Sequence, residues 1–308
     1  MNSSNSISTF RRIVQATLTN QVARFAPALY VQLTDQTGRG AGEVRLDEVG
    51  DYFQNCFDDY FEQLGVAKAD QANYLQGKRI LEYGPGDVPG VAILMVAHGA
   101  DQVVCVDRFP MVRMPPKNIQ IVKIMLERLS PPVRERAETC FRHAAHPEYG
   151  FNPKYIEYLV RPSGLSGLSS EVDLVISRAV LEHVNDLPAT FRDMHAALKP
   201  GGIALHQVDL KSHGLHLQNP LDFLNWPTWL WSLMYSAKGV PNRLRVDAYR
   251  DAIAQSGLEL MVMKPTLLAS LDDVRSIRPE LAEPFKRLSD EDLSWLGFWL
   301  VCRKPSVQ

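Results

Sequence analysis

The chain has 308 residues, of which 45% are hydrophobic, and a formal net charge of -2. This length and composition suffice for one large domain or two small ones with a full core. The near-neutral charge balance, with a pI of about 6.5, gives no basic footprint for nucleic acid, so we expect no nucleic-acid partner.

The cysteines and the apolar runs indicate the compartment. Four cysteines are scattered along the chain without metal-binding spacing, which predicts buried thiols in a reducing environment. No apolar run approaches the ~20 residues that cross a bilayer, and the Asn/Ser-rich start lacks a signal core. We therefore expect a soluble, cytoplasmic protein without a membrane span.

Residues 1–34 contain Arg11, Arg12 and Arg24 and no acid. This composition fits an organellar transit peptide, but the helical spacing of apolar residues up to Pro27 favours an amphipathic helix. A second helix is predicted over residues 49–64, whose aromatic stripe is typical of core. We therefore divide the chain into an N-terminal helical segment, 1–77, and a main domain, 78–308.

Residues 78–110 predict a strand, a glycine turn, a helix and a second strand. Gly84, Pro85 and Gly86 follow the first apolar strand, and backbone N–H groups in such a turn can approach a ligand. The helix that follows, 91–98, places its N-terminus as an anion site. Asp107 ends a second apolar strand, where a carboxylate can hold a ribose diol.

Pro89 replaces the third glycine of the dinucleotide fingerprint, which disfavours a nicotinamide cofactor. The runs LEYGPGDVPG and VVCVD instead resemble the first two motifs of the class I S-adenosylmethionine (SAM)-dependent methyltransferases. The resemblance implies a Rossmann-like, seven-stranded α/β sheet, SAM as cofactor, Glu82 and Gly84 near the methionine moiety, and N-terminal helices as a lid. A structural turn without a ligand is the alternative. The expected cofactor-binding residues are Glu82, Tyr83, Gly84, Pro85, Gly86, Asp107, Arg108, Ser177 and Arg178.

A second run, DLVISRAVLEHV followed by LKPGG, resembles the fourth-strand region of the same class. It predicts a strand over 172–176 and a helix capped by Asn185 or Asp186. A fifth strand is predicted over 202–210, and a third strand near 155–160 is less distinct. Ligands bind outside the carboxyl ends of parallel strands, which places the chemistry after Ser177 and near Asp209.

The Glu182-His183 pair resembles the ExxEH run of methyltransferases that bind a divalent metal, such as small-RNA 2′-O-methyltransferases and polyprenol-pathway O-methyltransferases. Ala179 stands where that run has its first acid. A hard cation needs several oxygen ligands, so we expect no metal. A histidine is then the expected base, with His213 ranked before His183, and Asp209 beside them.

An aromatic-rich insert over about 211–245 follows the fifth strand, where this class places substrate-specific elements. Trp226 and Trp229 are its candidate acceptor-binding residues, and packing on the sheet or on a partner subunit is the alternative. Arg243 and Arg245 are candidates to grip a carboxylate or phosphate, or else structural arginines. A helix over 246–256 and two strands, 258–263 and 294–301, then complete the sheet with an antiparallel pair.

The predicted function is SAM-dependent methylation of an oxygen on a small-molecule or sugar acceptor, in secondary-metabolite or polysaccharide biosynthesis. Methyl transfer needs mainly in-line positioning, plus a base where a hydroxyl must lose its proton. A non-catalytic scaffold with the same sheet and a nicotinamide oxidoreductase are the alternatives. The sequence leaves the oligomeric state open, with a homo-oligomer as one option.

Overall fold

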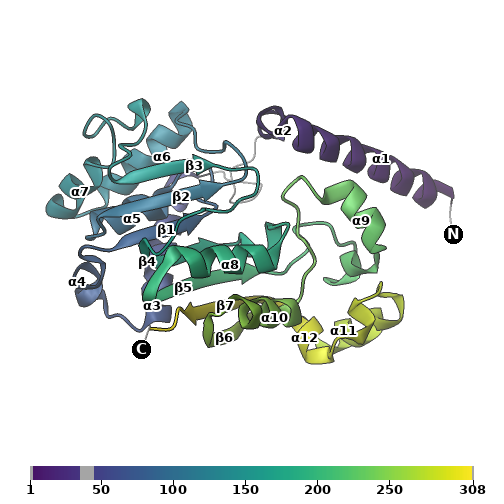
Figure 1. The fold of residues 1–308 in the computed structure, drawn as a ribbon. Helices are drawn as coiled ribbons and strands as arrows, with labels where there is room; N and C mark the ends of the chain where they lie inside the picture. The colour runs from purple at the N-terminus through teal and green to yellow at the C-terminus, as the bar shows by residue number, and fades with distance from the viewer. Residues whose placement is uncertain (1–2, 35–44, 307–308) are drawn as a thin grey trace.

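The structure is a computed structural model that describes residues 3–34 and 45–306; residues 35–44 of the expected N-terminal segment lie outside this part. A seven-stranded sheet forms its centre, in the order β3-β2-β1-β4-β5-β7-β6 (Figure 1). Strands β1 to β5 run parallel, and β7 runs antiparallel to both β5 and β6. The predicted Rossmann-like α/β fold is confirmed. The strands are β1 Arg79–Tyr83, β2 Gln102–Asp107, β3 Ile156–Val160, β4 Val172–Arg178, β5 Leu198–Asp209, β6 Glu259–Leu268 and β7 Trp295–Arg303.

Helices cover both faces of this sheet. One face carries α3 (Leu46–Leu64), α5 (Gly90–Ala97), α6 (Pro116–Glu127) and α7 (Pro131–Glu138), and the other carries α8 (Leu187–Ala197) and α10 (Val246–Ser256). Successive strand residues alternate between the two layers: Ile80 packs with the first group and Leu81 with the second. The continuous apolar runs in β1, β2 and β4 follow from this burial on both faces.

Local signals set the helix boundaries near the carboxyl edge. The side chain of Asp186 caps α8 by accepting a hydrogen bond from the backbone N–H of Ala189 at 2.8 Å, as one of the two predicted caps. Gly257 ends α10 in the left-handed conformation, with φ of 83°. Helix α8 therefore begins at the predicted cap, and α10 has the predicted bounds, 246–256.

The first helices, α1 (Ser3–Phe25) and α2 (Pro27–Thr34), confirm a helical N-terminus, but the packed face differs from the apolar stripe. Helix α1 lies beside α9 (Thr228–Tyr235) through Ala16 and Asn20, whereas Leu18 and Phe25 are exposed (Figure 1). The Asn20 side chain donates to the backbone carbonyl of Leu233. Small side chains and this hydrogen bond allow a close helix contact that large apolar residues would prevent.

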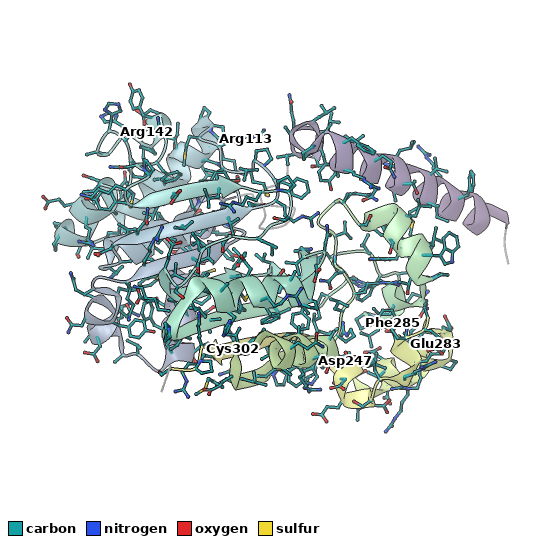
Figure 2. The ribbon with its side chains drawn as sticks, in the orientation of Figure 1. Arg113, Arg142, Asp247, Glu283, Phe285 and Cys302 are labelled. Atoms are coloured by element: carbon teal, nitrogen blue, oxygen red, sulfur yellow. The ribbon has the colours of Figure 1, made fainter. Side chains whose placement is uncertain are left out.

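The remaining elements are α4 (Gln71–Leu75), α11 (Leu271–Ile277), α12 (Asp290–Ser294) and short 3₁₀ turns. The four cysteines are free and buried, as predicted. Figure 2 labels one of them, Cys302 in the sheet, which lies far from Phe285 near α11. Within the described residues, no helix is long and apolar enough to cross a membrane.

Candidate active site

A cavity of about 680 Å³ opens at the carboxyl edge of the sheet, a size within the usual range for small-molecule sites. The loops after β1, β2, β4 and β5 meet there, with one wall from the insert. Its lining includes Tyr83, Gly84, Gly86, Asp107, Arg108, Arg178, Ala179, His183, Asp209 and His213. Most predicted cofactor-binding residues and all three predicted catalytic residues therefore lie around one cavity.

The glycine turn after β1 requires glycine for two separate reasons. Gly84 has φ of 63°, and a Cβ atom on it would lie 2.5 Å from a methyl group of Val180. Gly86 also has positive φ, at 74°. A Cβ on Gly90, which begins α5, would lie 2.3 Å from the Phe53 ring. The turn thus exposes bare backbone to the cavity while α5 packs closely on α3.

Asp107 ends β2 at the cavity, where one of its carboxylate oxygens accepts a hydrogen bond from the backbone N–H of Phe109 at 3.0 Å. Burial raises the pKa of Asp107 to about 6, although the backbone N–H groups of Phe109 and Arg108 oppose the rise. Arg108 donates to the backbone carbonyl of His183 at 3.0 Å and so ties the β2 loop to the β4 loop. A carboxylate whose oxygens accept hydrogen bonds, held at the end of a strand, suits the two hydroxyl groups of a ribose.

Glu82 is buried one residue before the turn and is not among the cavity-lining residues. The Cys105 thiol lies 3.6 Å from its carboxylate, and burial raises the pKa of Glu82 to about 7. Ser177 is also enclosed: its hydroxyl lies 2.7 Å from Nδ1 of His206, a cross-strand pair between β4 and β5. This hydrogen bond gives His206 a structural role within the sheet.

Helix α3 contributes to the site in a way that the sequence did not reveal. Its Asp59 pairs with Arg178 at 2.7 Å, and the guanidinium lies over the rings of Tyr52 and Trp299. Tyr52 itself lines the cavity. The aromatic stripe predicts core, and the resemblance adds a lid role; neither reveals the Asp59–Arg178 pair or the place of Tyr52 on the cavity lining.

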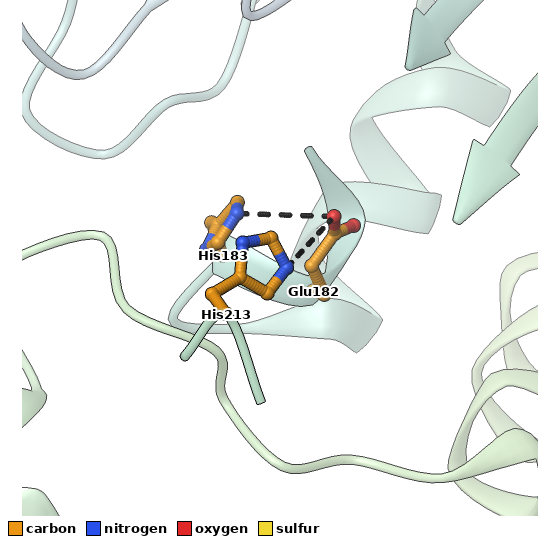
Figure 3. Close-up of side chains that lie close together, drawn as sticks. All are labelled: Glu182, His183 and His213. Carbon is orange, nitrogen blue, oxygen red and sulfur yellow. Dashed lines mark ion pairs between the residues drawn. The ribbon is translucent and has the colours of Figure 1, made fainter. Parts of the chain in front are cut away.

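The predicted catalytic residues cluster at one end of the cavity. A 3₁₀ turn over Leu181–His183, preceded by Ala179 with φ of 52°, presents Glu182 and His183, and His213 reaches them from the loop after β5. Nε2 of His183 and Nε2 of His213 lie 3.8 and 4.0 Å from one oxygen of Glu182 (Figure 3). Asp209 lies 4.0 Å from the same His213 nitrogen and pairs with Lys211.

Burial dominates the electrostatics of this cluster. It raises the pKa of Glu182 well above the usual range for a glutamate. Burial, and then the neighbouring His213, lower the pKa of His183 to about 3. Burial also lowers the pKa of His213, although Asp209 opposes this. Without a bound cation the two imidazoles are therefore neutral near pH 7.

The predicted acceptor-binding residues lie away from the cavity. Arg245 is buried and donates to three backbone carbonyls, those of Leu210, Leu293 and Trp295. Arg243 donates to the carbonyl of Trp226 at 2.7 Å and stacks on Trp231 and Phe285. These contacts match the structural alternative for both arginines.

The two tryptophans of the insert do not line the cavity either. Trp226 lies where the insert faces α1, and the guanidinium of Arg12 stacks on its ring. Trp229 lies on α9 and is 69% exposed. The insert nevertheless forms one wall of the cavity through small and aliphatic residues, Leu215 and 239–241. Gly164, in the loop between β3 and β4, also lines the cavity. Small residues at a cavity wall give no sequence signal that distinguishes them from ordinary loop.

The sheet order, with β7 antiparallel between β5 and β6, and the glycine turn facing Asp107 are those of a class I SAM-dependent methyltransferase. The cofactor fits the site, since a Cβ at Gly84 would fill the turn and Asp107 faces the cavity. A family model described as a methyltransferase domain matches residues 59–261, and the chain belongs to this family. The protein is thus a methyltransferase with SAM as its methyl donor.

Several solved structures are similar to this chain. One is a SAM-dependent methyltransferase from Mesorhizobium loti, at 18% identity over 74% of this chain and 92% of that chain, with a TM-score of 0.41. Another is phosphoethanolamine N-methyltransferase 2 from Haemonchus contortus in complex with SAM, at 15% identity over 82% and 53%, with a TM-score of 0.46. A putative sarcosine dimethylglycine methyltransferase from Galdieria sulphuraria is 14% identical over 82% and 86%, with a TM-score of 0.44.

Proposed function

We propose that this methyltransferase transfers the methyl group of SAM to an oxygen of a small-molecule or sugar acceptor. The observation that carries the proposal is a cluster of titratable side chains on the lining of one cavity. Asp107 and the glycine turn line this cavity, and so do His183, His213 and Asp209, whose part of the lining we call the acceptor end; Glu182 is buried next to the two histidines.

The acceptor end favours oxygen because it is built to manage a proton. A neutral amine attacks a methyl group without a base and sheds its proton afterwards, whereas a hydroxyl is a poor nucleophile until it is deprotonated. Two neutral imidazoles, His183 and His213, and two carboxyl groups, Glu182 and Asp209, lie close together there. Glu182 lies 3.8 Å from His183, and His213 lies 4.0 Å from both Glu182 and Asp209. Such a set favours an acceptor that must lose a proton in order to attack, as a hydroxyl must.

When bound, SAM supplies an electrophilic methyl group, and the chain supplies position and proton transfer. Asp107 would hold the ribose hydroxyls, with Glu82 near the methionine moiety. His213, 33% exposed in its side chain and next to Asp209, is the imidazole best placed to pass a proton to solvent. The N-terminal helices would act as a lid, because Thr34 and Tyr52 line the cavity mouth.

Purified protein incubated with SAM and a panel of phenols, sugars, hydroxy acids and amines tests the proposal. We expect release of S-adenosylhomocysteine and a product heavier by one methylene group only with oxygen acceptors, with the methyl group located on oxygen by NMR. Turnover of amines alone would overturn the oxygen assignment. Turnover of none, in protein that binds SAM, would remove small molecules of these classes as acceptors.

A further inference from the structure

The cluster of Glu182, His183 and His213 contains a buried carboxylate without a matching cation. Glu182 is 1% exposed, and neither of its side-chain oxygens accepts a hydrogen bond of normal geometry from the described residues. Backbone N–H groups of Glu182 itself and of Asp209 lie near enough to interact with it. In the described part of the chain its ion-pair partners are the two histidines alone. Burying an uncompensated carboxylate is costly, so such a group is usually protonated, paired or bound to a metal.

The three side chains are arranged like a chelating set. One ligand atom from each, a carboxylate oxygen and two imidazole nitrogens, lies within 4.8 Å of the others (Figure 3). Bonds from zinc to nitrogen and oxygen are about 2.0–2.2 Å long, so ligand atoms around one tetrahedral ion lie about 3.3–3.6 Å apart. The separations of 3.8 and 4.0 Å need about 0.5 Å of closure each, and the third, within 4.8 Å, needs at most about 1.5 Å.

The chemistry of the ligands selects the metal. Mg²⁺ and Ca²⁺ prefer carboxylates, carbonyls and water, whereas two imidazoles and one carboxylate suit zinc, iron, cobalt and related ions. Ala179, which faces the cavity next to this set, offers no oxygen. The expectation of no metal was based on the loss of a carboxylate for a hard cation, and that argument does not extend to a nitrogen-rich site.

We propose that Glu182, His183 and His213 bind one divalent transition metal ion, of which Zn²⁺ is the first candidate, with at least one coordination position open to the cavity. Both histidines line the cavity, so that position faces the acceptor end. A water or hydroxyl bound to such an ion has a strongly lowered pKa. The ion would therefore activate an acceptor hydroxyl in place of His213, which as a ligand no longer acts as the base, and the proton would pass to Asp209 or to water. This role rests on the proposed O-methylation, whereas the metal site itself does not.

The test measures binding directly in the full chain. Protein stripped with a chelator is titrated with Zn²⁺, Mn²⁺ and Mg²⁺ by calorimetry, and Co²⁺ is followed by its visible absorption spectrum. We expect one equivalent of Zn²⁺ or Co²⁺ to bind, with a rise in melting temperature and a spectrum of mixed nitrogen and oxygen ligation. Mg²⁺ should bind at least about tenfold more weakly than Zn²⁺.

Matched variants locate the ion. Glu182→Gln keeps the shape of the side chain and His213→Ala removes a loop ligand, and each should weaken Zn²⁺ binding at least about tenfold without weakening SAM binding. The control is His146→Ala, because His146 forms an exposed pair with Glu148 at 3.0 Å, away from the cavity. Loss of Zn²⁺ binding in this control, or unchanged binding in both site variants, would overturn the proposal, as would the absence of any stoichiometric ion.

The outcomes for the metal and for the reaction are separable. Methylation of oxygen that persists undiminished in metal-free protein would refute the activating role of the ion and leave the proposed reaction intact, whereas absence of stoichiometric binding would refute the metal site itself. Stoichiometric Zn²⁺ binding that depends on Glu182 and His213, in a protein that methylates only amines, would leave the metal site intact and refute the O-methylation.

Discussion

Replacing Asp107 by alanine removes the carboxylate that we propose for the ribose of SAM. A hydrogen bond to a charged group contributes roughly 1.5–3 kcal/mol, and about 1.4 kcal/mol corresponds to a factor of ten in Kd. If the carboxylate accepts from one ribose hydroxyl, SAM should bind about 10- to 150-fold more weakly to the variant. A second hydroxyl contact would raise the loss further.

The fold should tolerate this change. The pKa of Asp107 rises from 3.8 to about 6 through burial, so this group stabilises the folded chain fully only below about pH 4 and loses that contribution as the pH rises through about 6. Above that range the ionised carboxylate costs the unliganded fold roughly 3 kcal/mol, a net figure that already includes its hydrogen bond from Phe109. The unliganded variant should therefore be at least as stable as the parent chain at pH 8.

Calorimetric titration with SAM at pH 8, together with urea unfolding, measures both quantities. The exposed Asp101 at the start of the same strand gives the matched control, and Asp101→Ala should change neither. In the parent chain, SAM affinity should also fall as the pH drops below about 6, because a protonated carboxyl group accepts fewer hydrogen bonds. A folded Asp107→Ala variant with SAM affinity within threefold (about 0.7 kcal/mol) of the parent would refute the assignment.

Three further predictions concern stability and the glycine turn. Gly84→Ala should lower SAM affinity and destabilise the fold more than Gly77→Ala, because both have positive φ but only Gly84 would meet Val180; unfolding curves that coincide would contradict this. Arg245→Ala should lower the free energy of unfolding by roughly 3–5 kcal/mol in urea, since three buried carbonyls lose their donor, and a loss below about 1 kcal/mol would argue against this role. Burial raises the pKa of Glu82 to about 7, so its protonated form stabilises the parent fold at low pH and this stability is lost as the pH rises from about 5 to 8. Glu82→Gln should flatten this loss in the free energy of unfolding. An unchanged slope would show that burial does not govern the pKa of this carboxyl group.

The sequence predicted the centre of the fold well because local rules and global packing agree there. The apolar runs that became β1, β2 and β4 are buried on both faces, and the glycine turn lies where the chain reverses into α5. Asp107 could be placed because the end of a strand is visible in the sequence as the end of an apolar run.

Prediction was poorer where packing overrides periodicity. Part of the apolar stripe of α1, including Leu18 and Phe25, is exposed because Ala16 and Asn20, which are small or hydrogen-bonded, make the closer contact with α9. The density of aromatic residues in the insert likewise pointed to Trp229 as a residue of the cavity wall. Trp229 is exposed instead, and small residues over 239–241 line the cavity. Neither outcome can be read from composition, because each depends on which surfaces the rest of the chain leaves available.

The acceptor end shows the same limit in its chemistry. From the sequence, Glu182 and His183 are neighbours, and the missing acid at Ala179 dominates the argument about metal. His213 lies thirty residues later, after a whole helix and strand, and only the parallel pairing of β4 with β5 brings its loop beside theirs. Since a metal site is defined by the atoms that converge in space, replacing an oxygen ligand in the motif changes which ion is preferred without deciding whether any ion binds.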